Sequence, residues 1–396
     1  MKSIKEIFIV GNGPSSSHTI GPSKALDFIL NKYKDIDKIE IILYGSLALT
    51  GKGHLIDVVI NNKLKDIKHE IKFDYFTKVN HPNTMDFIIY KNNEIFKERI
   101  YSIGGGTIKV KGEKSNKIVG IYKENTLKEI LFYCKENNKS LLEYVLDKEK
   151  DILIYLKNIL KIMDEASIRG INNVGELPGS LHVIKKANAI YNEAIKNDND
   201  NLKNNALVMA YAFAVSEENA SGGIVATAPT CGSSGVIPGV IKYLRLNNID
   251  DNKIIESLAV AGLIGEIIKT NATVSGAVAG CQAEIGAASS MASAMIMNAF
   301  NANNEKIAQA AEIALEHSLG LTCDPIDGYV QIPCIERNAI FALKSINASQ
   351  LAFLIDSDSS KISFDEIVKT MYETGKDLKS GYKETSKAGM SKLLSK

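Results

Sequence analysis

Three of the five cysteines in this chain lie at intervals that could bring thiolates to one metal. Cys281, Cys323 and Cys334 are separated by 42 and then 11 positions, and a glycine or proline lies next to or near each. Neither interval is the two-to-four-residue spacing of paired zinc-ribbon cysteines, which leaves a site assembled from separate elements. The spacing is equally compatible with small hydrophobic side chains in a packed helical core, because free cysteine is among the most buried residue types.

A 4Fe-4S cluster is the metal group that such dispersed thiolates could hold. The cluster has four irons and usually four cysteine ligands, and these can be spread widely along a chain. Three cysteines would leave one iron open, and an open iron is a Lewis acid that can bind a hydroxyl or carboxylate oxygen. A fully ligated cluster would instead suit electron transfer.

Several long and uncommon motifs of the chain resemble those of the iron-sulfur L-serine dehydratases. They run from about Gly13 to Ser386, nearly the whole chain, and read GPSSSHTIGP, APTCGSSGVIPGV, CQAEIG, LGLTCDPIDGYVQIPCIERN and YKETS. The resemblance implies that Cys281, Cys323 and Cys334 hold a 4Fe-4S cluster with one open iron. It also implies the conversion of L-serine to pyruvate and ammonia, an activity of amino-acid degradation and gluconeogenesis.

Composition and charge argue against a nucleic-acid-binding or membrane protein. The 396 residues carry a net charge of +1, and no dense basic run is interleaved with aromatic residues. The apolar run 7–10 is too short for a signal peptide, and the uncharged stretches 219–241 and 285–304 are rich in small polar residues. Five cysteines without disulfide-like spacing indicate the cytoplasm. We expect a homodimer whose substrate is the small molecule L-serine.

The elements that must position these residues predict an α+β fold in two domains. Residues 1–123 carry short strand-like runs and one helix, 22–34, and predict a small α+β domain. Residues 124–396 carry helical patterns and predict a larger, mostly α-helical catalytic domain. The strand-like runs are 7–11 (IFIVG), 38–46, 57–62 (DVVINN), 87–92 and 117–123.

The six histidines lie in different sequence contexts. His69 lies in a charged run, and His182 and His317 lie in segments that look helical, so all three are interpreted as surface or structural residues. The other three lie in turn-like strings that match the dehydratase motifs, and loops carry chemistry more often than regular elements do. These candidate catalytic residues are His18, His54 and His81.

The segment 15–19 immediately precedes the predicted helix 22–34. Its hydroxyl groups can cap the first turn, and the free N–H groups of a helix N-terminus can equally bind a carboxylate. The glycines of YSIGGGTI suit either a β-bulge or a close backbone approach to substrate. The candidate substrate-binding residues are Ser15, Ser16, Ser17, Thr19, Asn83, Gly104, Gly105, Cys231 and Arg337.

Cys231 lies at the centre of the segment 219–239, which is too rich in Gly, Pro and Ser for one helix and too apolar for a solvent loop. Such a segment usually lines a site. We expect Cys231 to line the pocket without binding iron, because a fourth thiolate would occupy the iron that substrate must reach. Arg337 could bind a carboxylate of substrate, or it could pair structurally with Asp324 or Glu336. Cys134 is expected in the core.

The predicted reaction is an elimination that needs help at both ends of the substrate. His54 is predicted to remove the α-proton, His81 and Asn83 to orient substrate, and His18 with segment 15–19 to hold the carboxylate. An open iron would bind the serine hydroxyl. Alternatives are a related cluster lyase acting on L-cysteine and a metal-stabilised amino-acid-binding protein. A pyridoxal-phosphate lyase is disfavoured, because no phosphate-binding loop stands beside a clear Schiff-base lysine.

Two departures from the family pattern accompany the resemblance. The connection between GKGHLID and HPNTM is shorter than expected for single-chain relatives, which puts the shape of the small domain in doubt. The chain also has no cysteine after Cys334, so we expect no thiol of its own tail on the open iron.

Overall fold

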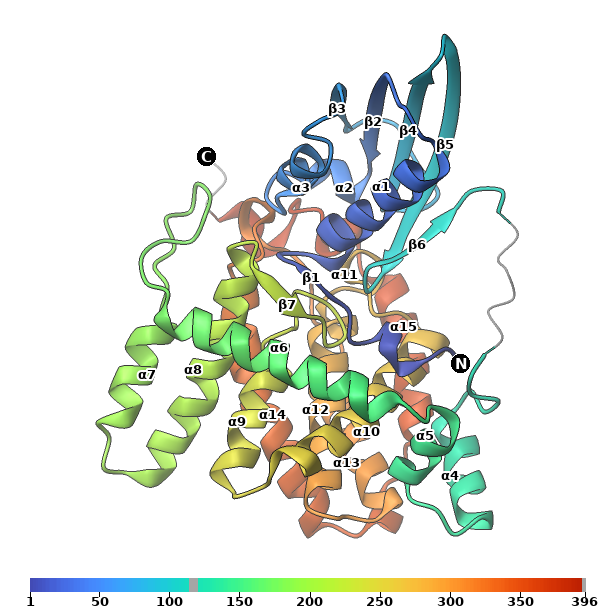
Figure 1. The fold of residues 1–396 in the computed structure, drawn as a ribbon. Helices are drawn as coiled ribbons and strands as arrows, with labels where there is room; N and C mark the ends of the chain where they lie inside the picture. The colour runs from blue at the N-terminus through green and yellow to red at the C-terminus, as the bar shows by residue number, and fades with distance from the viewer. Residues whose placement is uncertain (114–119, 394–396) are drawn as a thin grey trace.

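The structure is a computed structural model that describes residues 1–113 and 120–393. A sheet-containing unit built from the N-terminal part lies at one end of a larger body of helices (Figure 1). This arrangement confirms the α+β fold class. The boundary between residues 123 and 124 stays a prediction.

The sheet-containing unit has five strands in the order β3–β2–β4–β5–β6, with β2 and β3 parallel and the other pairs antiparallel. Ile39, Ile41 and Leu43 of β2 are buried in alternation with less buried residues, as expected for a sheet covered on one face. They pack with apolar side chains of α1 and α3. The elements are α1 Gly21–Lys32, β2 Lys38–Tyr44, α2 Ser46–Leu49, α3 Ile56–Lys63, β3 His69–Asp74, β4 Thr84–Lys91, β5 Glu94–Gly104 and β6 Thr107–Val110.

The helical body is organised around α12, all fifteen residues of which are buried. This helix packs against α9, α10, α13 and α14. Its small residues allow close approach, because a Cβ at Gly286 would lie only 2.7 Å from the Cβ of Ser318. The helices are α4 Leu127–Glu136, α5 Leu141–Lys148, α6 Ile152–Asn172, α7 Ala187–Ile195, α8 Asp200–Ala220, α9 Val236–Leu246, α10 Asp251–Asn271, α11 Gly276–Ala279, α12 Ile285–Ala299, α13 Asn304–Glu316, α14 Cys334–Leu354 and α15 Phe364–Asp377.

Short elements connect the two parts of the molecule. The strand β1 (Val10–Asn12) pairs with β7 (Ile224–Ala226), although they lie more than 200 positions apart. Met1, Ile4 and Phe8 are buried in the core of the helical body. The remaining short elements are the 3-10 turns η1 Ile4–Glu6, η3 Cys281–Ala283, η4 Ile326–Gly328, η5 Ser357–Ser359, η6 Ser380–Tyr382 and η7 Gly389–Lys392, and the π-helical turn η2 Ser16–Ile20.

Three local predictions were wrong. Segment 57–62 forms α3 rather than a strand, because Ile56 and Ile60 are spaced one helical turn apart and both face the core. Segment 7–11 is mostly non-regular and enters β1 only at Val10. His182 lies in a loop with a positive φ of 49° rather than in a helix. The predicted strand 117–123 lies partly outside the described residues.

Two other local predictions, for the stretch 285–304 and for Cys134, were confirmed. The stretch 285–304 is a buried helix over most of its length, and Cys134 is fully buried on α4. Within the described residues, no helix is both long and apolar enough to cross a membrane.

Candidate active site

A small cavity lies between the sheet-containing unit and the helical body. Residues from both parts line it, and they include six of the residues that the sequence predicted. Two carboxylates that the sequence analysis did not predict, those of Glu284 and Glu384, also line the cavity. The six predicted residues are Ser15, His54, Cys281, Cys323, Cys334 and Arg337.

The three cysteines reach the cavity from three different elements. Cys281 begins η3 after Gly280, whose φ of 74° and close approach to the Leu321 carbonyl oxygen exclude a side chain there. Cys323 lies in the loop before η4, and Cys334 is the first residue of α14. The sulfur atoms of Cys281 and Cys323 lie within 4.8 Å of each other. The cysteines therefore converge although their spacing in the sequence is irregular.

Arg337 gives the thiol cluster a positive neighbour. Its guanidinium donates a hydrogen bond of 2.8 Å to the Thr322 carbonyl oxygen and lies beside Cys281. The hydrogen bond from Cys323 and the nearby guanidinium lower the pKa of Cys281 to about 6. Burial raises the pKa of the Cys334 thiol. At neutral pH this arrangement favours a thiolate at Cys281.

The other arginines of the chain have carboxylate partners, which sets Arg337 apart. Arg99, Arg169 and Arg245 pair with Asp86, Glu218 and Asp164 respectively. The two carboxylates considered as structural partners of Arg337 are engaged elsewhere: Asp324 accepts from Thr322 and Met390, and Glu336 pairs with Lys186.

His54 presents one ring nitrogen to the cavity in the unprotonated form. The ring is almost fully buried, and Nδ1 lies 2.8 Å from the carbonyl oxygen of Thr50. Because a carbonyl only accepts hydrogen bonds, Nδ1 carries the proton and Nε2 keeps its lone pair. Burial lowers the pKa of His54 to about 4. The imidazole is therefore neutral at pH 7 and can accept a proton at Nε2.

The turn that carries His54 is held tightly against the helical body. A Cβ at Gly53 would lie 2.7 Å from the backbone of Gly328 in η4. Leu55, which follows His54, has a positive φ of 57° and is the N-cap residue of α3. This close approach brings a side chain of the sheet-containing unit to cysteines of the helical body.

His18 lies directly behind His54 and is surrounded by hydroxyl groups. Its Nδ1 is 2.8 Å from Ser17 Oγ, and its Nε2 is 3.0 Å from Thr50 Oγ1 and 3.3 Å from Ser46 Oγ. The ring is fully buried, and burial followed by the neighbouring His54 lowers its pKa. These contacts fix the orientation of the ring, which supports a positioning role more directly than a role as proton acceptor.

Glu384 completes this group from the C-terminal part of the chain. Its Oε1 lies 3.6 Å from His54 Nε2 and 3.8 Å from His18 Nδ1. Its backbone N–H donates to the Cys323 carbonyl oxygen, and its own carbonyl oxygen accepts from Ser46 Oγ. Burial raises the pKa of Glu384 to about 8. One residue thus joins the histidines, the sheet-containing unit and a cysteine loop.

The segment 15–19 forms the π-helical turn η2, which continues into α1. Ser15 caps the turn by accepting from the His18 N–H, and Thr19 Oγ1 donates to the Asn12 carbonyl oxygen. Ser15 lines the cavity and Ser17 contacts His18. Ser16 is buried but is not among the lining residues. The capping interpretation is therefore correct for Ser15, and a carboxylate-binding role of this turn stays a prediction.

His81 and Asn83 lie beside the cavity rather than among its lining residues. Asn83 is buried, and both polar atoms of its side chain lack a hydrogen-bond partner within the described structure. His81 Nδ1 accepts from the Asn83 N–H, and burial lowers the pKa of its ring. The intervening Pro82 carbonyl oxygen accepts from Ser46 N–H, next to His18. An unpartnered buried amide is unfavourable unless a ligand satisfies it.

The remaining predicted residues lie in less direct positions. Gly104 ends β5 and Gly105 begins the turn to β6. Both have a positive φ, and they approach Ser275 and Lys269 of the helical body. Cys231 packs in a small apolar cluster with Ile20 and Val225, and its neighbour Gly232 lines the cavity in its place. Burial raises the pKa of the Cys231 thiol.

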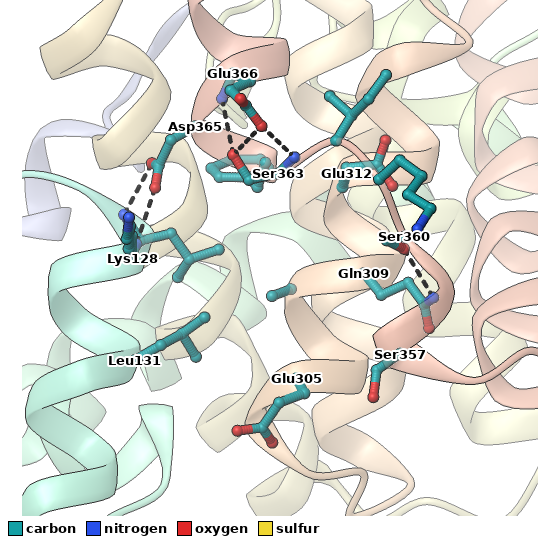
Figure 2. Close-up of a pocket in the computed structure, with 15 residues that line it drawn as sticks. Lys128, Leu131, Glu305, Gln309, Glu312, Ser357, Ser360, Ser363, Asp365 and Glu366 are labelled. Carbon is teal, nitrogen blue, oxygen red and sulfur yellow. Dashed lines mark hydrogen bonds between the residues drawn. The ribbon is translucent and has the colours of Figure 1, made fainter.

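A larger groove of about 360 Å³ lies between α4, α13 and the start of α15, and it shares no lining residue with the cavity (Figure 2). Three of its polar side chains serve helix ends. Asp365 accepts from the N–H groups of Leu127 and Lys128, and Ser363 and Glu366 form a capping box. These hydrogen bonds give Asp365, Ser363 and Glu366 a structural role at the ends of α4 and α15.

Comparison with known proteins agrees with this geometry. The sequence profile of the serine dehydratase beta chain matches residues 3–67, and that of the serine dehydratase alpha chain matches residues 59–391. The chain is 37% identical to an L-serine dehydratase of Haemophilus influenzae over 452 aligned positions and to L-serine dehydratase 1 of Escherichia coli over 448, each covering 98% of both proteins. It is 38% identical to an L-serine dehydratase of Helicobacter pylori, with 99% of both covered.

Fold, cavity and similarity together define an enzyme of the lyase class. The chain belongs to the serine dehydratase family and carries the beta-type and alpha-type parts in one polypeptide. Because the alignments exceed the 396 residues of the chain, these relatives contain segments that it lacks. That agrees with the expectation that the connection between GKGHLID and HPNTM is short. The position of the missing segments along the chain stays a prediction.

Proposed function

We propose that this protein is an L-serine ammonia-lyase that converts L-serine to pyruvate and ammonia with a 4Fe-4S cluster bound by Cys281, Cys323 and Cys334. The observation that carries the proposal is the position of His54, whose unprotonated Nε2 faces the same cavity as the three thiols. A base and a set of soft metal ligands in one enclosed space fit an elimination that needs both a base and a Lewis acid.

The three cysteine thiols fit an iron-sulfur cluster better than they fit the other metals that are common in proteins. Soft thiolates from separate elements suit such clusters, and none of the three shares a CxxC pair. The Arg337 guanidinium would offset negative charge on the thiolates. It donates a hydrogen bond to the Thr322 carbonyl oxygen and lies beside the Cys281 sulfur. When bound, the cluster would supply a Lewis acid for the substrate hydroxyl.

The residues of the chain can perform the other steps. The N–H groups and hydroxyls at the start of η2 would bind the serine carboxylate, with Ser15 nearest the cavity. The Asn83 amide, which has no hydrogen-bond partner among the described residues, would orient the substrate with His81. His54 Nε2 would remove the α-proton, while the Thr50 carbonyl oxygen and the stacked ring of His18 hold the imidazole in place. The aminoacrylate that results becomes an imine and hydrolyses without further catalysis.

The experiment that tests this function is an assay of anaerobically purified protein with L-serine and, in parallel, with L-cysteine. Equal amounts of pyruvate and ammonia from L-serine, at a higher kcat/KM than from L-cysteine, are expected. Preferential release of sulfide from L-cysteine would favour the cysteine lyase. Amino-acid binding without turnover of either would favour a metal-stabilised binding protein.

We further propose that the protein acts as a homodimer in the cytoplasm, without nucleic-acid or membrane partners. The near-neutral net charge of +1 supports the absence of nucleic-acid partners, and the unpaired spacing of the cysteines supports the cytoplasm. An oxygen-sensitive cluster would also require a reducing compartment.

A further inference from the structure

Glu284 occupies a position in the cavity that none of the roles above explains. It lies between η3 and α12, three residues after Cys281, so its backbone is fixed by the same turn that presents that cysteine. One carboxylate oxygen and the sulfur atoms of Cys281 and Cys323 all lie within 4.8 Å of one another. An oxygen donor therefore stands directly among the proposed iron ligands.

The space around this carboxylate depends on Gly276, whereas Gly232 leaves ordinary contact distance. A Cβ at Gly276 would lie 2.5 Å from Oε2 of Glu284 and 3.2 Å from Cys323 Sγ. A Cβ at Gly232 would lie 3.6 Å from Oε1. A side chain at position 276 would therefore displace the Glu284 carboxylate from its present position.

The charge of Glu284 lacks a direct protein counter-ion. Among the described residues no lysine, arginine or histidine nitrogen lies within 4.0 Å of its carboxylate, although Arg337 lines the same cavity and the Thr230 hydroxyl interacts with the carboxylate. A carboxylate held in such a place is unfavourable unless it is protonated or coordinates a metal.

The other carboxylate of the cavity is placed for a different task. Glu384 lies 3.6 and 3.8 Å from the ring nitrogens of His54 and His18. The two carboxylates are thus divided between the proton-transfer group and the thiol group. Only Glu284 is grouped with two of the thiols.

We propose that Glu284 is the fourth protein ligand of the cluster in the substrate-free enzyme, and that the hydroxyl of L-serine takes over this position on binding. The inference rests on the proposed cluster function and adds a residue to it. The exchange replaces one oxygen donor by another and involves no change in oxidation state. Glu284 would protect the reactive iron until substrate arrives, because an iron without a protein ligand is easily lost.

The test compares wild type with Glu284→Gln and Glu284→Ala after anaerobic assembly of the cluster with ⁵⁷Fe. Ferricyanide removes one electron from a [4Fe-4S]²⁺ cluster and releases Fe²⁺, leaving [3Fe-4S]⁺, which has its own paramagnetic resonance signal. Both variants should assemble a cluster and then lose the fourth iron at least about tenfold faster than wild type, the scale on which ligand-shell changes alter metal affinity. The Mössbauer spectrum of one iron should also differ from wild type before serine is added.

Two controls make the outcome specific. Glu312→Gln makes the same chemical change at a buried carboxylate on α13 and should leave the rate of iron loss unchanged. Altered iron loss in Glu384→Gln, with none in the Glu284 variants, would overturn the inference in favour of the other carboxylate. Unaltered iron loss and spectra in all the glutamate variants would also overturn it while leaving the cluster function intact. Wild type that assembles no cluster would overturn the proposed function itself.

Discussion

The imidazole rings of His18 and His54 stack with their centroids 4.2 Å apart and an angle of 21° between the ring planes. Two buried rings at this distance disfavour protonation of each other, and burial lowers the pKa of both. The pair is therefore neutral at physiological pH. Of the two, His54 faces the cavity, whereas both nitrogens of His18 are engaged with hydroxyl groups.

Replacing His54, the proposed base, should strongly reduce turnover without affecting the cluster. His54→Asn is expected to lower kcat by roughly 10²-fold or more, the usual contribution of a positioned general base. The visible absorption of the cluster should stay unchanged, because His54 binds no metal in the proposal. His69→Asn, on the sheet-containing unit, is the control and should retain activity. Near-normal turnover in His54→Asn with loss of turnover in His81→Asn would exchange the two roles.

The buried His54 should also make stability depend on pH. Its pKa is about 4 in the folded state and near 6.5 when unfolded, so the unfolded chain binds more protons between these values. The stabilising contribution is fully present above about pH 6.5 and is lost as the pH falls towards 4. Between pH 7 and pH 4 the loss is on the order of 3 kcal/mol.

Urea unfolding of the cluster-free protein at several pH values measures this effect. The free energy of unfolding of wild type should fall more steeply with decreasing pH than that of His54→Asn. Equal slopes for wild type and the variant would show that His54 is not held neutral by burial.

Glu384 should act by holding the histidines rather than by binding iron. Glu384→Gln keeps the size of the side chain but removes its titratable carboxyl group, and Oε1 lies within 4 Å of both rings. We expect kcat to fall by about 10²-fold with little change in KM, because a misplaced base loses that much. The acid limb of the pH–rate profile should shift as well, which a purely structural defect would not cause. An unchanged kcat would remove Glu384 from the site.

The cysteines should separate into ligands and a core residue. Cys281→Ser, Cys323→Ser and Cys334→Ser should each prevent stable assembly of the cluster, since two remaining thiolates hold a cube poorly. Cys231→Ser should assemble a cluster, because Cys231 packs in an apolar cluster with Ile20 and Val225. Iron content after anaerobic reconstitution distinguishes these results. Loss of iron in Cys231→Ser would place a fourth thiolate on the cluster.

The sequence predicted the thiols and the imidazole that line the cavity, but it did not predict the two carboxylates. Cys281, Cys323, Cys334 and His54 belong to motifs whose residue types already indicate chemistry, and all four line the cavity. Glu284 and Glu384 lie in the quoted motifs CQAEIG and YKETS, yet a lone glutamate carries no signal of burial in sequence. Only the fold, which returns the C-terminal segment to the Cys323 loop, reveals the position of Glu384.

The errors in secondary structure have a similar origin. Segment 57–62 is rich in β-branched residues, and its helix is stabilised by packing of Ile56 and Ile60 against the sheet rather than by intrinsic preference. Likewise, Val10 joins a strand only because β7 lies beside it, more than 200 positions away. Long-range packing of this kind cannot be recognised from a short window of sequence.

The most direct test of the central claim measures iron, colour and activity together during exposure to air. Protein purified anaerobically should be brown, should contain about four irons per chain and should form pyruvate from L-serine. On exposure to air the visible absorption and the activity should decay with the same time course, and anaerobic iron and sulfide should restore both. A colourless protein that contains zinc and retains full activity in air would contradict the account.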